Sequence, residues 1–264
     1  MSEASPEDTR YDTLKEIVRS RLEGWPPRRE GYHWAGYTYD HTIRVTNLAT
    51  AMGRTAGADE RVSRYAALLH DIAKPVGDDH ARVGAEQARD LMQELDFDPE
   101  FTDRVTSAIA THAGGTSPGD PLENFLLGDA DFIDANFGLV GTWRFITIRG
   151  GRGDDLTDIV AGMAEWLQKK DELAMRLKTD LGSAIAHERL ERMMRFCGVL
   201  DDSFLREGDM DKPQVWLARY IHAHSDTGRL MQQVQTLTNG TSHEAPTEVT
   251  PLLERLEAEI DGAK

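Results

Sequence analysis

The sequence predicts an all-α protein. Apolar residues recur at the i, i+3, i+4 and i+7 spacing of an amphipathic helix along most of the 264 residues. No run of alternating apolar and polar residues predicts a series of strands, and no internal repeat is visible. Helices are therefore expected at about residues 11–23, 38–56, 80–95, 99–113, 121–136, 154–178, 181–198, 212–237 and 250–260, with a further one that begins after Asp59 and leads into His70-Asp71.

Glycine, proline and short polar residues mark the ends of these helices. The first is expected to end at the proline pair after Gly24, because proline cannot continue a helical hydrogen-bond ladder. Gly57 closes the second, and Asp59 is a suitable N-cap for the third. The Gly-Gly-Arg-Gly stretch at 150–153 predicts a loop, and residues 239–248 predict a polar connection.

The composition excludes several classes of protein. The chain has 46 acidic and 30 basic residues, a net charge of −16, which argues against general nucleic-acid binding and against docking on an anionic membrane. It does not exclude a small phosphorylated substrate, because a local field can oppose the global one. A single cysteine, Cys197, rules out an internal disulfide framework. There is no membrane-length apolar run, and residues 1–10 lack a signal-peptide core, so the expected location is the cytoplasm.

Histidine and aspartate recur where the sequence is otherwise apolar. His41 shares a helical face with valine, leucine, alanine and methionine, and His70-Asp71 ends the apolar run 66–69. His112 ends the apolar face of its helix, and Asp131 lies within the apolar stretch 126–133. Buried charges are usually paired or bound to metal, since burying one alone costs several kcal/mol. Imidazoles with carboxylates suit a divalent transition ion.

At these residues the sequence resembles the HD superfamily of metal-dependent phosphohydrolases. The resemblance rests on His41, the His70-Asp71 dyad within Leu-Leu-His-Asp-Ile-Ala-Lys, and the distant Asp131, and it extends over about residues 37–200. The stretch 128–135, Gly-Asp-Ala-Asp-Phe-Ile-Asp-Ala, is similar to a branch whose bacterial members hydrolyse nucleotides. Phe132 departs from that branch, which commonly has a basic residue there.

The resemblance implies a metal site with His41, His70, Asp71 and Asp131 as ligands. Asp129 is the alternative to Asp131; if Asp131 is the ligand, Asp129 is expected to orient a ligand histidine. One divalent ion is expected, of the group Mn, Fe, Co, Ni, Mg or Zn. It would activate a water molecule and polarise the phosphoryl oxygen.

Four residues have additional, open roles. Asp71 is a candidate acceptor for the proton of the attacking water. Lys74 follows almost one turn after Asp71, so it either contacts the substrate phosphate or is a solvated lysine at a helix end. His80 and His112 either bind a second ion or contact phosphate.

These interpretations combine into a hypothesis about organisation and function. We expect an N-terminal helix and lead-in at 1–36, an HD phosphohydrolase domain at 37–200, and a C-terminal helical extension of unassigned role at 201–264. The expected activity is cleavage of a phosphate ester or anhydride, with a nucleotide as the favoured substrate. The alternatives are a dinuclear iron oxygenase of the same superfamily and a non-catalytic nucleotide sensor. Oligomerisation is left open.

Overall fold

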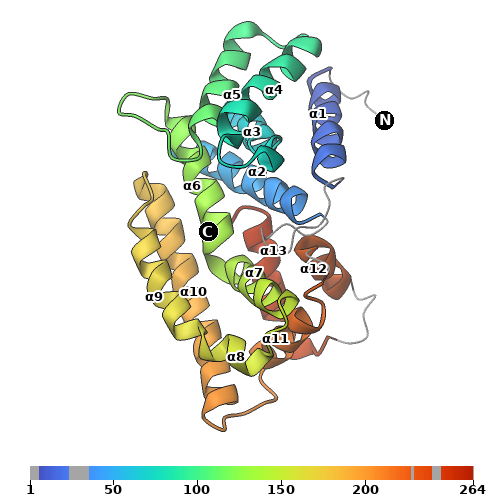
Figure 1. Ribbon diagram of the computed structural model, residues 1–264, viewed down its shortest axis with the longest axis vertical. Helices are drawn as coiled ribbons and strands as arrows, with labels where there is room; N and C mark the ends of the chain where they lie inside the picture. The colour runs from blue at the N-terminus through green and yellow to red at the C-terminus, as the bar shows by residue number, and fades with distance from the viewer. Residues whose placement is uncertain (1–5, 24–35, 227–228, 240–244, 264) are drawn as a thin grey trace.

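The computed structural model describes residues 6–23, 36–226, 229–239 and 245–263, and thirteen α-helices account for most of this part of the chain (Figure 1). No strand occurs within the described ranges, so the all-α prediction is confirmed. The helices are α1 (Pro6–Glu23), α2 (Tyr37–Ala56), α3 (Glu60–Leu69), α4 (His80–Glu94), α5 (Pro99–Thr111), α6 (Leu122–Asn136), α7 (Gly138–Gly151), α8 (Leu156–Ala161), α9 (Met163–Ala174), α10 (Asp180–Leu205), α11 (Pro213–Ala223), α12 (Leu230–Thr238) and α13 (Thr250–Ile260). None of the helices in these ranges has the length and hydropathy needed to cross a membrane.

The observed helices differ from the expected ones in three places. Helix α7 was not predicted, and it includes Gly150 and Gly151, so the predicted loop at 150–153 begins too early. A Cβ at Gly150 would lie 2.9 Å from Ser225 Oγ, which shows that this glycine permits close packing rather than a turn. The expected helices 154–178 and 212–237 are each divided in two. The proline pair after Gly24 lies outside the described residues.

One hydrophobic core lies among α1 to α6 and the N-terminal half of α10. Helix α2 packs mainly against α3 and α6, and α4 packs against α5. The fully buried side chains of this core include Leu48, Met52, Leu68, Leu69 and Ile109. His70, Asp71 and His112, which directly follow α3 and α5, are buried within this half of the molecule.

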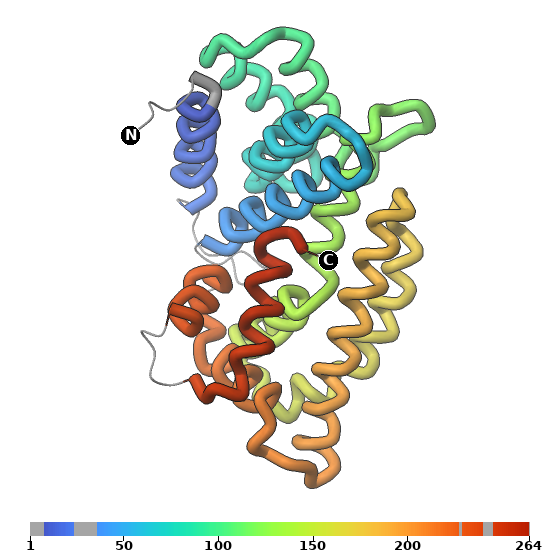
Figure 2. The backbone as a smooth tube through the Cα atoms, turned by 180° about the vertical axis from the view of Figure 1, so that it is seen from behind, coloured from blue at the N-terminus to red at the C-terminus, as the bar shows by residue number. Residues whose placement is uncertain are grey.

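A second core forms between α7, α8 and the helices from α10 to α13. Helix α13 reaches back to the first half of the molecule and lies beside α2 (Figure 2). At this contact Asn47 Nδ2 of α2 donates to the carbonyl of Ile260 at 2.9 Å. The buried Arg189 of α10 donates to the carbonyl of Ala263, just after α13, at 3.0 Å. The C-terminal helices therefore support the helix that carries His41. The division into units at 1–36, 37–200 and 201–264 stays a prediction.

Candidate metal centre

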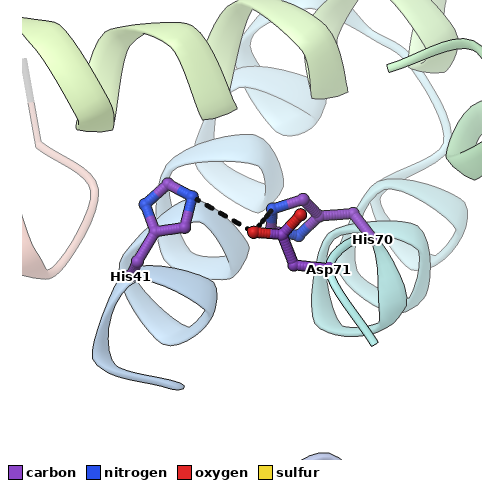
Figure 3. A group of neighbouring side chains, drawn as sticks. All are labelled: His41, His70 and Asp71. Atoms are coloured by element: carbon purple, nitrogen blue, oxygen red, sulfur yellow. Dashed lines mark ion pairs between the residues drawn. The ribbon is translucent and has the colours of Figure 1, made fainter. Parts of the chain in front are cut away.

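Three helices bring the four candidate ligands to one point. His41 lies in the first turns of α2, and His70 and Asp71 follow the last turn of α3, whose start is capped by Asp59. Asp131 extends from the middle of α6. Figure 3 shows His41 on one helix pointing towards His70 and Asp71 on another. All four were predicted from the sequence, and the fold brings them together.

The distances among these side chains are those of a compact cluster. His41 Nε2 lies 3.0 Å from Asp131 Oδ1 and 3.9 Å from Asp71 Oδ2. His70 Nε2 lies 3.6 Å from Asp71 Oδ2 and 3.9 Å from Asp131 Oδ1. His41, His70 and Asp71 are buried, whereas Asp131 is partly exposed, so the cluster is reached from its Asp131 side.

Hydrogen bonds through Nδ1 fix the orientation of three histidine rings. His70 Nδ1 donates to the carbonyl of Ala67 at 2.7 Å, and His112 Nδ1 donates to that of Ile109 at 2.6 Å. His41 Nδ1 donates to Asp134 Oδ2 at 2.7 Å. A ring that donates through Nδ1 presents an acceptor lone pair at Nε2 when it is neutral, which is the form that binds metal.

The donor atoms that face the centre of the cluster fit a divalent ion. Within the described residues, His70 Nε2, Asp71 Oδ2 and His112 Nε2 are buried and have no hydrogen-bond partner. Unsatisfied buried polar atoms are costly and rare, so three of them around one point form a donor set that could hold a cation. One ligand atom each of His41, His70 and Asp71 lie within 4.8 Å of one another, and so do those of His70, His112 and Asp131.

The protonation of these groups also suits a cation site. Burial lowers the pKa of His70 and of His112, which keeps both imidazoles neutral. Burial alone would raise the pKa of Asp71, but the neighbouring His70 and Lys74 lower it to about 2. For His41, burial opposes the charge, yet the carboxylates of Asp131 and Asp134 raise its pKa to about 10. A cation bound here would replace the positive charge of that proton.

Asp134 is a site residue that the sequence reasoning missed. Its carboxylate contacts His41 Nδ1 and also accepts two hydrogen bonds from the fully buried Arg44, at 2.9 and 3.0 Å. The position of Asp134 on the same face of α6 as Asp131 was visible in the sequence, but its partner was not.

The expectation that Asp129 orients a ligand histidine is wrong. Asp129 accepts hydrogen bonds from the backbone N–H groups of Lys178 and Thr179, at 2.8 and 2.9 Å, and from the Thr179 hydroxyl at 2.7 Å. It therefore fixes the segment between α9 and α10 on α6. Asp134 makes the histidine contact instead.

Lys74, His80 and His112 lie on the other side of Asp71. Lys74 Nζ is 3.0 Å from Asp71 Oδ1, and His80 Nε2 and His112 Nε2 are 3.5 and 3.9 Å from the same oxygen. Asp71, His80 and His112 thus form a third group of donor atoms within 4.8 Å of one another. Asp71 is shared by two of the three groups, so the cluster has donors for a second ion beside the first.

A cavity of about 590 Å³ opens next to the cluster. His112 and Asp131 are among its lining residues, and the segment fixed by Asp129 contributes Arg176 and Lys178. Phe125 and Phe132 add apolar surface. A cavity of this size holds a small organic molecule, with its charged part near the cluster and the two basic residues.

Comparison with known proteins agrees with this geometry. Residues 38–136, which include every candidate ligand, match the HD domain family. Within the matched residues, His41, His70, Asp71 and Asp131 lie in the order and helical settings that the sequence resemblance implies.

The similarity of two relatives extends beyond the HD domain. The uncharacterized protein YpgQ of Bacillus subtilis is 29% identical over 173 residues, which cover 63% of this chain and 84% of YpgQ. The crystal structure of YpgQ in complex with ADP has a TM-score of 0.55 at 24% identity and covers 76% of this chain. A predicted HD superfamily hydrolase from an uncultured Thermotogales bacterium has a TM-score of 0.51 at 26% identity and covers 73% of this chain and 91% of that one.

Ribonuclease Y of Alkaliphilus metalliredigens shares the HD domain alone. It is 34% identical over 99 residues, which cover 36% of this chain and 19% of that enzyme. This chain therefore spans about a fifth of the ribonuclease Y length.

Proposed function

We propose that this protein is a metal-dependent phosphohydrolase that cleaves a phosphate ester or anhydride of a nucleotide. The observation that carries the proposal is the set of buried Nε2 and carboxylate atoms without hydrogen-bond partners, beside a cavity whose lining includes Arg176 and Lys178. His41, His70, Asp71 and Asp131 would hold the ion. A bound divalent ion would supply an acidified water molecule and polarise the phosphoryl oxygen.

The cavity supports a nucleotide as the substrate. Arg176 and Lys178 offer positive charge to phosphate oxygens, while Phe125 and Phe132 offer faces on which a base or sugar can pack. YpgQ, which shares this fold, has been crystallised with ADP. The net charge of −16 favours a small nucleotide over a long nucleic acid, because a polyanion would be repelled outside the cavity.

Asp71 and Lys74 would act on the reacting groups themselves. Asp71 touches the histidines on both sides, so it can bind the ion through one oxygen and accept the proton of the attacking water through the other. Burial disfavours the charge of Lys74, but Asp71 and Asp131 raise its pKa, so it stays protonated. Being partly exposed, Lys74 can offer that charge to the phosphate.

The test is a screen for turnover with defined ions. The protein is stripped of metal with a chelator, resupplied singly with Mn, Fe, Co, Ni, Mg or Zn, and assayed with nucleotides for released phosphate and pyrophosphate. We expect turnover with at least one ion and loss of turnover to background in His70→Ala and Asp71→Ala. No turnover with any ion, or full turnover in both variants, would contradict the proposal.

The role of the cavity is tested with charge variants. Arg176→Gln should raise KM for the nucleotide with little change in kcat, because the lost contact holds the substrate before and during the reaction. Lys169→Gln removes the same charge from an exposed position on α9 and should change neither constant. Equal effects of the two variants would remove the support for this cavity as the substrate site.

A second candidate function follows from the third group of donors. Asp71, His80 and His112 could hold a second ion, as a dinuclear oxygenase of this superfamily would require. Oxygen consumption with iron in place of phosphate release would establish that function instead.

A further inference from the structure

A second cavity, of about 260 Å³, lies between α7 and α9. It shares no lining residue with the cavity at the metal centre. Four of its nine lining residues are basic, namely Arg144, Arg149, Arg152 and Lys170, and none of the nine is acidic. Such a concentration of cations is unusual in a chain with only 30 basic residues among 264.

Lys170 is the most informative of these residues. Only 6% of it is exposed, and its ammonium group donates to the neutral side-chain amide of Asn136, at 2.7 Å. Buried lysines usually face a carboxylate. Burial and the charge of nearby Arg144 lower the pKa of Lys170 to about 8, which shows that the cavity disfavours the positive charge it contains. An anion bound in the cavity would favour the charged form of Lys170 and so raise its pKa.

The other walls set the size and shape of a ligand. Trp166 and Phe145 stack on each other with ring centroids 4.3 Å apart and form an apolar side. Arg149 is partly compensated by an ion pair with Asp154, and Arg144 Nη1 donates to the carbonyl of Ala135 at 3.0 Å. The volume lies below the roughly 300–1,000 Å³ of sites for drug-sized ligands, so it suits a compact ion.

We propose that this cavity, lined by Arg144, Arg149, Arg152 and Lys170, binds a compact phosphate-bearing anion of the size of pyrophosphate. Phosphate oxygens match the guanidinium and ammonium donors that line it. Ala135 lies one helical turn after Asp131 on α6, so the site touches the helix that carries a candidate metal ligand. The proposal does not depend on the phosphohydrolase activity.

Calorimetric titration of inorganic pyrophosphate into the full chain, after metal removal by a chelator, tests the proposal. Metal removal prevents pyrophosphate from binding through an ion at the cluster of His41, His70, Asp71 and Asp131. We expect Lys170→Gln and Arg144→Gln to weaken binding by about 10–100-fold, as expected for the loss of one charged hydrogen bond. Lys170→Arg keeps the charge and should retain most of the affinity. Circular dichroism checks that each variant is folded.

A matched control separates the charges of this cavity from the general charge of α9. Lys169→Gln removes a neighbouring exposed charge and should leave pyrophosphate affinity within about twofold, since Lys169 does not line the cavity. Absence of binding, equal binding to the Lys170→Gln variant, or an equal loss in the Lys169→Gln variant would each overturn the proposal. A loss in Arg176→Gln with none in Lys170→Gln would place the binding in the larger cavity and would also overturn it.

A parallel titration with ADP identifies the source of the phosphate group. If Lys170→Gln also weakens ADP binding, the site accepts the phosphates of a nucleotide. If Lys170→Gln weakens the binding of pyrophosphate but not of ADP, the site takes the free anion. Both results support the site and differ only in its ligand.

Discussion

Asp134 Oδ2 lies 2.7 Å from His41 Nδ1, and the same carboxylate is held by both Nε and Nη2 of Arg44. This buried series of hydrogen bonds from Arg44 through Asp134 fixes the His41 ring so that its Nε2 faces the other candidate ligands. Arg44 is 2% exposed, so the chain cannot easily rearrange. Carboxylates that orient a ligand histidine in this way commonly contribute 10–100-fold to metal affinity.

Asp134→Asn should therefore weaken Mn²⁺ binding by about 10–100-fold. The amide can still contact His41, but it cannot carry the charge that Arg44 requires. Binding is measured by calorimetry with Mn²⁺. Asp129→Asn is the matched control on the same helix, because Asp129 contacts only the 178–179 segment among the hydrogen bonds described. An equal loss in both variants would show that the effect is a general weakening of α6.

The metal content distinguishes one ion from two. We expect elemental analysis to give about one ion per chain, held by His41, His70, Asp71 and Asp131. The double variant His80→Ala with His112→Ala should keep that ion. A content near two that falls to one in the double variant would instead place a second ion at Asp71, His80 and His112.

Two glycines of α10 should respond in opposite ways to alanine. A Cβ at Gly182 would lie 2.4 Å from Asp129 Oδ2, a carboxylate that three hydrogen bonds hold in place, so Gly182→Ala should lower the free energy of unfolding by about 1–3 kcal/mol. A Cβ at Gly198 would meet no atom within 4 Å, so Gly198→Ala should raise it by about 0.5–1 kcal/mol. Urea denaturation measures both. Stabilisation by Gly182→Ala would mean that Asp129 can move away freely.

Lys170 should make stability depend on alkaline pH. Its pKa is about 8 in the folded protein, because of burial and Arg144, against 10.5 for an ordinary lysine. Between these values the unfolded state binds more protons, so the free energy of unfolding should rise with pH, by up to about 3 kcal/mol. The rise is measured as the difference between the unmodified protein and Lys170→Met. Lys169→Met provides the control, and a pH-independent difference for Lys170 would show an ordinary pKa.

Cys197 should be inert in the folded protein. It is 2% exposed, and burial raises the pKa of its thiol to about 12. The thiolate is the reactive form, and its fraction near pH 8 falls by about a thousandfold for such a shift. A thiol reagent should therefore modify the native protein far more slowly than the protein in urea. Rapid stoichiometric reaction of the native protein would contradict the buried position.

The sequence was most informative where a polar residue interrupted a helical face. His41 and the His70-Asp71 pair stand in apolar runs, so their burial and their approach to one another could be predicted from local periodicity and the family resemblance. Asp134 could not be assigned in this way, because its partners Arg44 and His41 lie about ninety residues earlier in the chain. The helical periodicity of a sequence predicts which face of a helix a residue occupies, but not which distant residue packs against that face.

Two of the expectations that the structure corrects have the same origin. Asp129 is expected from the sequence to orient a ligand histidine, whereas its hydrogen bonds go to a segment fifty residues later. The glycines at 150 and 151 predict a loop, whereas they lie in α7, where Ser225 approaches Gly150. In both cases a contact distant in sequence decides the role of the residue.

The packing of α13 beside α2 has a consequence for how the protein is made. Asn47 and Ile260 are 213 positions apart, so a ribosome must translate more than two hundred further residues before this contact can form. Contacts between such distant segments form late, since a long loop must close first. The helix that carries His41 therefore lacks one of its neighbours until α13 has been made. We expect the nascent chain to bind a metal ion tightly only after α13 has left the ribosome.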